Sequence, residues 1–109
     1  MQREDEIRLR HMLDAAREAA SFAKGKSRGD LDHDRQLVLS IVRSVEIVGE
    51  AASKVSQPFQ SAHPSVPWAV IIGMRNRLIH AYFDVDLDRV WDTVENDVPL
   101  LISELEKLL

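Results

Sequence analysis

The apolar residues in the middle of the chain follow a strict helical spacing, and this spacing constrains the fold more than any other feature. They recur at alternating intervals of three and four, which places them on one face of an α-helix that packs beside others in a bundle. Gly49 lies within this segment at a cost of about 1 kcal/mol relative to alanine, so we expect it to permit a close helix contact. The pattern predicts a helix from about residue 31 to residue 56, with an apolar face made of Val38, Ile41, Val45, Val48, Ala52 and Val55.

Two further segments show the same kind of apolar face. The first runs from about residue 3 to residue 24 and ends at a polar loop that contains two glycines. The second reaches the end of the sequence; Pro99 within it should kink the helix or open a new one, with Asn96 or Asp97 as the cap. The apolar faces are Leu9, Leu13, Ala16, Ala20 and Ala23 in the first segment, and Leu87, Val90 or Trp91, Val94, Val98, Leu101, Leu105 and Leu108 in the second.

Prolines separate the second helix from a third. Pro58 and Pro64 indicate a loop, and Pro67 suits the first turn of a third helix capped by Ser65. No alternating strand pattern stands out anywhere in the sequence. We therefore predict a single all-α domain over residues 1–109, an antiparallel bundle of four long helices, with Pro99 as the point where the last helix can break in two.

Composition and charge exclude several classes of protein. There is no cysteine, so neither a disulfide framework nor a thiolate metal site is present, and no apolar run approaches the ~20 residues of a membrane span. The charged N-terminus lacks the apolar core of a signal peptide, so we expect a cytoplasmic protein. Residues 84–109 hold eight acidic and two basic residues, a net charge of −6, whereas residues 1–83 carry +2. The positive charge around Arg75 and Arg77 can therefore still hold a phosphate.

Residues 74–82 concentrate the polar chemistry of the chain. Arg75 offers a planar fork of donors that matches a phosphate, and His80 can move a proton near neutral pH. Asn76 and Arg77 add further donors, and Tyr82 adds a phenol. Together these groups are sufficient to bind or cut a phosphodiester without a metal or another cofactor.

The spacing of this motif does not place its parts on one helix face. Arg75 and His80 lie about 140° apart on a regular helix, so one ideal helix cannot aim both at the same phosphorus. Either the helix loosens near Gly73 or His80, or two copies meet across a two-fold axis and each supplies part of a shared cleft. We favour a combination of the two, and hence a homodimer with the motif at its interface.

Four blocks of sequence resemble the HepT-like family of HEPN domains. They are IVGEAA at residues 47–52, HPSVPW at 63–68, GMRNRLIHAY at 73–82 and VW at 90–91, and the resemblance extends from about Leu9 to Leu105. It implies a metal-independent endoribonuclease, the toxin of a type VII-like toxin–antitoxin pair whose antitoxin is a minimal nucleotidyltransferase. Arg75 and His80 match the nuclease positions of the family, and Asn76 matches the polar position after the arginine. Tyr82 matches the tyrosine that the partner modifies with AMP to silence the toxin.

The same residues support this chemistry on physical grounds. RNA carries its own nucleophile, the 2′-hydroxyl, and His80 can take its proton while Arg75 stabilises charge on the non-bridging oxygens. The expected products are a 2′,3′-cyclic phosphate and a 5′-hydroxyl. Glu50 or Glu46, both on the second helix, could orient Arg75 as a buried ion pair.

One alternative to this hypothesis remains, and one further signal is set aside. The acidic C-terminal segment also fits a non-catalytic nucleotide-binding or adaptor subunit that docks a nucleotidyltransferase. The Asp84, Asp86 and Asp88 triplet has the spacing of a calcium loop, but Arg89 stands where that loop needs glycine, so we interpret these acids as helix caps and first-turn charges and expect no metal.

Overall fold

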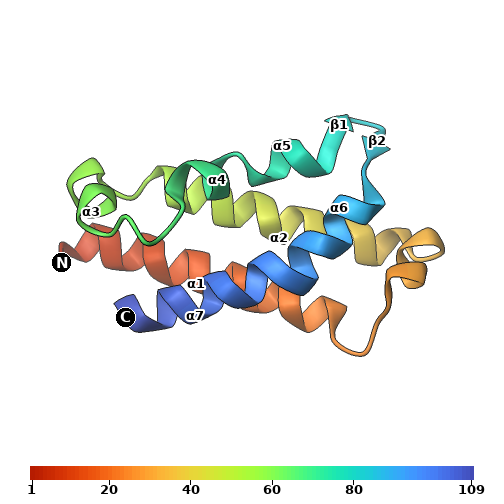
Figure 1. Cartoon of the computed structure of the whole chain (residues 1–109), viewed down its shortest axis with the longest axis horizontal. Coiled ribbons are helices and arrows are strands. Elements are labelled where there is room, and N and C mark those ends of the chain that lie inside the picture. The colour runs from red at the N-terminus through yellow and green to blue at the C-terminus, as the bar shows by residue number, and fades with distance from the viewer.

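Three long helical segments form the body of the molecule in the computed structural model, which describes residues 1–109 (Figure 1). The first helix runs in one direction, and the other two return antiparallel to it, so that the N- and C-termini lie at the same end (Figure 1). No helix is both long and apolar enough to cross a membrane. The three segments are α1 (Arg3–Ala23), α2 (Arg35–Ser53) and a continuous C-terminal helix composed of α6 (Leu87–Asp92), the π-helical turn η2 (Thr93–Asp97) and α7 (Val98–Leu108).

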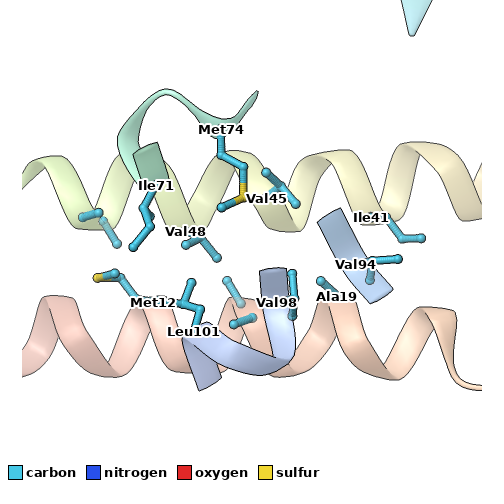
Figure 2. Packing of buried hydrophobic residues seen from close by; sticks show 14 of the residues in the cluster. Met12, Ala19, Ile41, Val45, Val48, Ile71, Met74, Val94, Val98 and Leu101 are labelled. Carbon is cyan, nitrogen blue, oxygen red and sulfur yellow. The ribbon is translucent and has the colours of Figure 1, made fainter. Parts of the chain in front are cut away.

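One hydrophobic core lies between these helices, and it confirms the apolar faces predicted for them. Every residue on the predicted apolar face is buried, from Val38 to Val55, although α2 ends at Ser53 and Val55 follows it. Figure 2 shows side chains of α1, α2 and α7 pointing toward one another, including Met12, Val48 and Leu101. Three alanines of α1, Ala15, Ala16 and Ala19, are buried in this core. Burial of the apolar face thus outweighs the weak helix propensity of the β-branched residues on α2.

The connection between α1 and α2 is a polar loop, as predicted, with a short 3₁₀ helix, η1 (Arg28–Asp32), inside it. Gly25 takes a positive φ of 75° just after α1 ends, a conformation that favours glycine. The Asp34 side chain accepts a hydrogen bond of 3.0 Å from the Leu37 amide and so fixes the start of α2. The helix therefore begins at Arg35, somewhat later than the apolar spacing alone predicts.

The prediction of four long helices is wrong, because the predicted third helix is divided into two short pieces, α4 (Trp68–Ile72) and α5 (Met74–Leu78). The loop predicted before it is also partly wrong, because it contains a further short helix, α3 (Gln57–Ala62). Pro58 lies in the first turn of α3, whereas Pro67 directly precedes α4 and Ser65 makes no capping bond. Gly73 separates α4 from α5.

A small antiparallel hairpin follows α5, although the sequence predicted no strand. It pairs β1 (Ile79–Ala81) with β2 (Asp84–Val85), with Ile79 opposite Val85 and an irregular register beyond that pair. The Asp86 amide donates a 2.7 Å hydrogen bond to the Leu78 carbonyl and closes the base of the hairpin. Residues 79–81 therefore leave the helix that was expected to run through the motif.

Pro99 lies in the first turn of α7, so one of the two predicted alternatives, a new helical segment at this proline, is confirmed. The backbone nevertheless stays helical, because Asp92, Thr93, Asp97 and Val98 all keep right-handed helical torsions. Asp97 is at the N-cap position of α7, but its side chain makes no capping hydrogen bond. The π-helical turn directly precedes the proline, where the missing amide removes one donor of the regular ladder. Asn96 instead donates a 2.8 Å hydrogen bond to Asp92 on the same helix.

Candidate active site

Gly49 allows the end of α4 to lie directly against α2. A Cβ at this position would be 3.2 Å from the carbonyl oxygens of both Ile71 and Ile72. The predicted close helix contact is therefore confirmed. Ile71 and Met74 point into the core toward α2 (Figure 2), so the backbone on both sides of the Gly73 break is anchored.

This anchoring places Arg75 over the outer face of α2. Its Nε donates a 3.1 Å hydrogen bond to Glu46 Oε2, and its Nη1 lies 3.4 Å from Asn76 Oδ1. Arg75 and Asn76 line a hollow of about 300 Å³ together with Glu46 and Glu50. The Arg75 and Glu46 side chains remain 45% and 27% exposed, so the ion pair is open to solvent and not buried, contrary to the expectation.

Glu46, and not Glu50, is the carboxylate that contacts Arg75. Glu50 lies 3.5 Å from Arg43, and the same guanidinium lies 3.5 Å from Glu46. The two glutamates are four residues apart and share one face of α2, so the sequence left both possible. The structure therefore assigns Glu50 to the wall of the hollow, beside the ion pair rather than in it.

His80 lies on β1 in different surroundings. Its Nε2 is 3.3 Å from Asp86 Oδ2, and its side chain is 59% exposed. The other oxygen of Asp86 accepts a 3.1 Å hydrogen bond from the Arg89 amide and caps α6. The pKa of Asp86 is lowered, first by this amide and also by the bond to His80, so the carboxylate stays charged beside the imidazole.

The remaining motif residues are open to solvent. Tyr82 is 92% exposed at the turn of the hairpin. Arg77 is exposed and its side chain has no hydrogen-bond or ion-pair partner. These groups can therefore meet a large ligand without losing an existing contact.

Within one chain, the predicted site residues form two separate groups. Arg75 and Asn76 share a hollow, whereas His80 and Tyr82 share the hairpin, and the hollow around Arg75 does not include His80. The helix does loosen at Gly73 and again before His80, as one of the two predicted alternatives requires.

Sequence reasoning missed two residues of this region. Asp86 was identified as a helix cap, but its contact with His80 depends on the hairpin, which no alternating pattern in the sequence indicates. Arg43 was not considered; its spacing of three from Glu46 was the one available indication of their ion pair.

Comparison with known proteins gives a consistent result. A family model described as Ribonuclease HepT-like matches residues 12–108. A protein of Thermococcus cleftensis named "Probable ribonuclease HepT" is 41% identical over 75 residues, 69% of this chain and 68% of that protein. Two proteins named "Putative RNase" match more of the chain: one of Caldanaerobacter subterraneus is 37% identical, covering 93% of this chain and 90% of its own, and one of Methanocaldococcus jannaschii is 33% identical, covering 90% of each. No solved structure matches the chain.

Proposed function

Because the chain belongs to the HepT-like ribonuclease family, we propose that it is an endoribonuclease that uses Arg75 and His80 and needs no metal. The observation that carries this proposal is the state of these two side chains. Each is held by a carboxylate, Glu46 or Asp86, while about half of its surface stays open to solvent. Both are therefore oriented and still able to contact RNA.

The reaction follows from the chemistry of these groups. The 2′-oxygen attacks the adjacent phosphorus as His80 accepts its proton, and the bond from phosphorus to the 5′-oxygen breaks. The guanidinium of Arg75 stabilises the charge that develops on the non-bridging oxygens, and a second donor protonates the departing 5′-oxygen. The products are a 2′,3′-cyclic phosphate and a 5′-hydroxyl end.

We propose that the working unit is a homodimer with a shared cleft. The different surroundings of Arg75 and His80 in one chain support it, because a two-fold axis can place Arg75 of one copy opposite His80 of the other. In the dimer, the imidazole of His80 from the second copy also provides the donor that protonates the departing 5′-oxygen. Sedimentation of the purified protein tests the dimer: a protein that stays monomeric at assay concentrations and still cleaves RNA would contradict it.

The toxin role and its control by AMP transfer are also proposals. Tyr82 is the most exposed of the large hydrophobic residues and lies two residues from His80, so it is accessible to a nucleotidyltransferase antitoxin. AMP on its hydroxyl would add bulk and negative charge at the RNA site, and so repel the substrate. With the nucleotidyltransferase and ATP present, wild type should take up AMP and lose activity, whereas Tyr82→Phe should do neither; AMP uptake by Tyr82→Phe would place the modification elsewhere.

RNA cleavage in EDTA tests the main proposal. His80→Ala should cleave at least 100-fold more slowly than wild type, since general base catalysis typically contributes 10²–10⁴-fold. His11→Ala is the matched control, because His11 is an exposed histidine on α1. Products should carry cyclic phosphate ends. Equal rates for wild type and His80→Ala would remove His80 from the mechanism. A protein that cleaves no RNA but co-purifies with a nucleotidyltransferase would instead be an adaptor.

A further inference from the structure

A second hollow lies beside the hairpin, on the side of α2 where that helix begins. Its volume is about 330 Å³, at the lower end of the range for small-molecule sites. Aliphatic side chains from η1, α2, β2 and α6 form half of its lining. Phe83, Arg35, His33 and Asp32 contribute the aromatic and polar groups. None of these residues belongs to the catalytic pair described above.

Phe83 is unusual among the apolar residues of the chain. It is 73% exposed at the hairpin turn, where the hydrophobic effect would favour burial. Its ring meets Tyr82 edge-on, with centroids 5.1 Å apart and planes at 79°. An edge-on contact occupies at most one face of the Phe83 ring, and a flat aromatic ligand can stack on the other face.

The polar groups of the hollow suit a ligand with hydrogen-bonding edges. Arg35 and His33 are exposed, and neither side chain has a hydrogen-bond or ion-pair partner. Asp32 would repel an RNA strand, but Arg28 lies 3.1 Å from it and compensates its charge. Arg28 also contacts Asp88 at 2.7 Å, and this ion pair links η1 to α6, which are two of the elements that line the hollow.

We propose that this hollow binds one base of the RNA substrate, next to the phosphodiester that is cleaved. The base stacks on Phe83 over the aliphatic lining, and its edge meets Arg35 and His33. Proteins recognise single-stranded RNA in this way, by stacking unpaired bases on aromatic or guanidinium planes. Arg35 and His33 can also bind a phosphate, but a phosphate would leave the face of Phe83 and the aliphatic half of the lining without a ligand contact.

The position of Phe83 connects this site to the cleavage reaction. It follows His80 by three residues on the same hairpin, so a base held at Phe83 would fix the neighbouring sugar and phosphate relative to the imidazole. The hollow would then select which nucleotide flanks the cleaved bond. This inference rests on the proposed ribonuclease function for its substrate, but its test relies on binding and does not require cleavage.

Binding of a fluorescent single-stranded RNA, measured by anisotropy in a His80→Ala background, tests the proposal. Phe83→Ala should weaken binding about 5- to 150-fold, as expected for the loss of one stacked base. Phe83→Trp should retain affinity, whereas Phe83→Leu, apolar but not aromatic, should lose most of it. Leu100→Ala is the matched control, because Leu100 is 69% exposed on α7, away from the hairpin, and should bind as the background does.

An RNA series with one base removed at each position sharpens the experiment. At one position, removal of the base should weaken binding to proteins that contain Phe83 and have little effect on Phe83→Ala, because the two changes delete the same contact. Unchanged affinity for Phe83→Ala and Phe83→Leu would overturn the proposal even if wild type cleaves RNA. Conversion of a dimer to a monomer by Phe83→Ala would also overturn it, since a second copy would then cover the hollow. If RNA binding depends on Phe83 but wild type cleaves nothing, the base site stands and the ribonuclease proposal fails.

Discussion

Replacing Gly49 with alanine tests how the fold positions the arginine of the site. In an open helix the change would stabilise the protein by about 1 kcal/mol. Here the new methyl group would lie 3.2 Å from two backbone carbonyl oxygens, closer than ordinary van der Waals contact. Overpacking of this kind typically costs about 1–3 kcal/mol. The free energy of unfolding should therefore fall by up to about 2 kcal/mol, measured by urea denaturation.

The same substitution should also lower the rate of RNA cleavage. The crowded carbonyls belong to Ile71 and Ile72, directly before the Gly73 break and Arg75, so the guanidinium should move when α4 shifts. We expect the rate of RNA cleavage to drop about tenfold, since a displacement of ~1 Å can cost 10²-fold.

Gly29→Ala is the matched control for this substitution. Its methyl group would meet only Ser27 Oγ at 3.8 Å, so stability and activity should hardly change. If Gly49→Ala instead stabilises the protein by the full helix-propensity gain and keeps its activity, the close contact does not position the site.

Three further predictions concern the carboxylates. Glu46→Gln should slow cleavage of RNA more than Glu50→Gln does, because only Glu46 contacts the arginine of the site; similar rates for the two variants would contradict this assignment. Asp86 should titrate below the ordinary carboxyl pKa of 3.8 in an NMR experiment, so that its capping contribution is present above that pH and is lost as the pH falls through the lowered pKa. A pKa above 3.8 would mean that the helix amide and His80 do not hold the charged form. Asp5→Asn should lower the free energy of unfolding at pH 7 by about 1–3 kcal/mol, because the buried carboxylate accepts bonds from the Ser56 amide and hydroxyl; equal stability of wild type and variant at pH 7 would show that these bonds contribute nothing.

The long helices were predictable because the residues that they bury recur at a regular spacing within each helix. The face from Val38 to Val55 was assigned residue by residue from spacing alone, and all of it is buried. The role of Gly49 was likewise predictable, since a glycine on an apolar helix usually marks a close approach. In both cases the determining pattern lies within one segment of sequence.

The hairpin and the pairing of the site residues were not predictable in this way. A strand of three residues such as β1 is too short for an alternating pattern to be recognised, and β2 is shorter still. The choice of Glu46 over Glu50 depends on where α5 crosses α2, which is a long-range feature. The same holds for the contact between His80 and Asp86, because it exists only when the hairpin is formed.

The kinetics of the double variant Arg75→Ala with His80→Ala test most directly whether the two side chains act on one phosphate. Each single substitution should lower kcat/KM for RNA by at least about 100-fold. If both groups serve the same transition state, the double variant should be little slower than the slower single variant, because residues that act as a unit are strongly non-additive. Losses that multiply, or a single variant that cleaves at the wild-type rate, would show that the guanidinium and the imidazole do not act together.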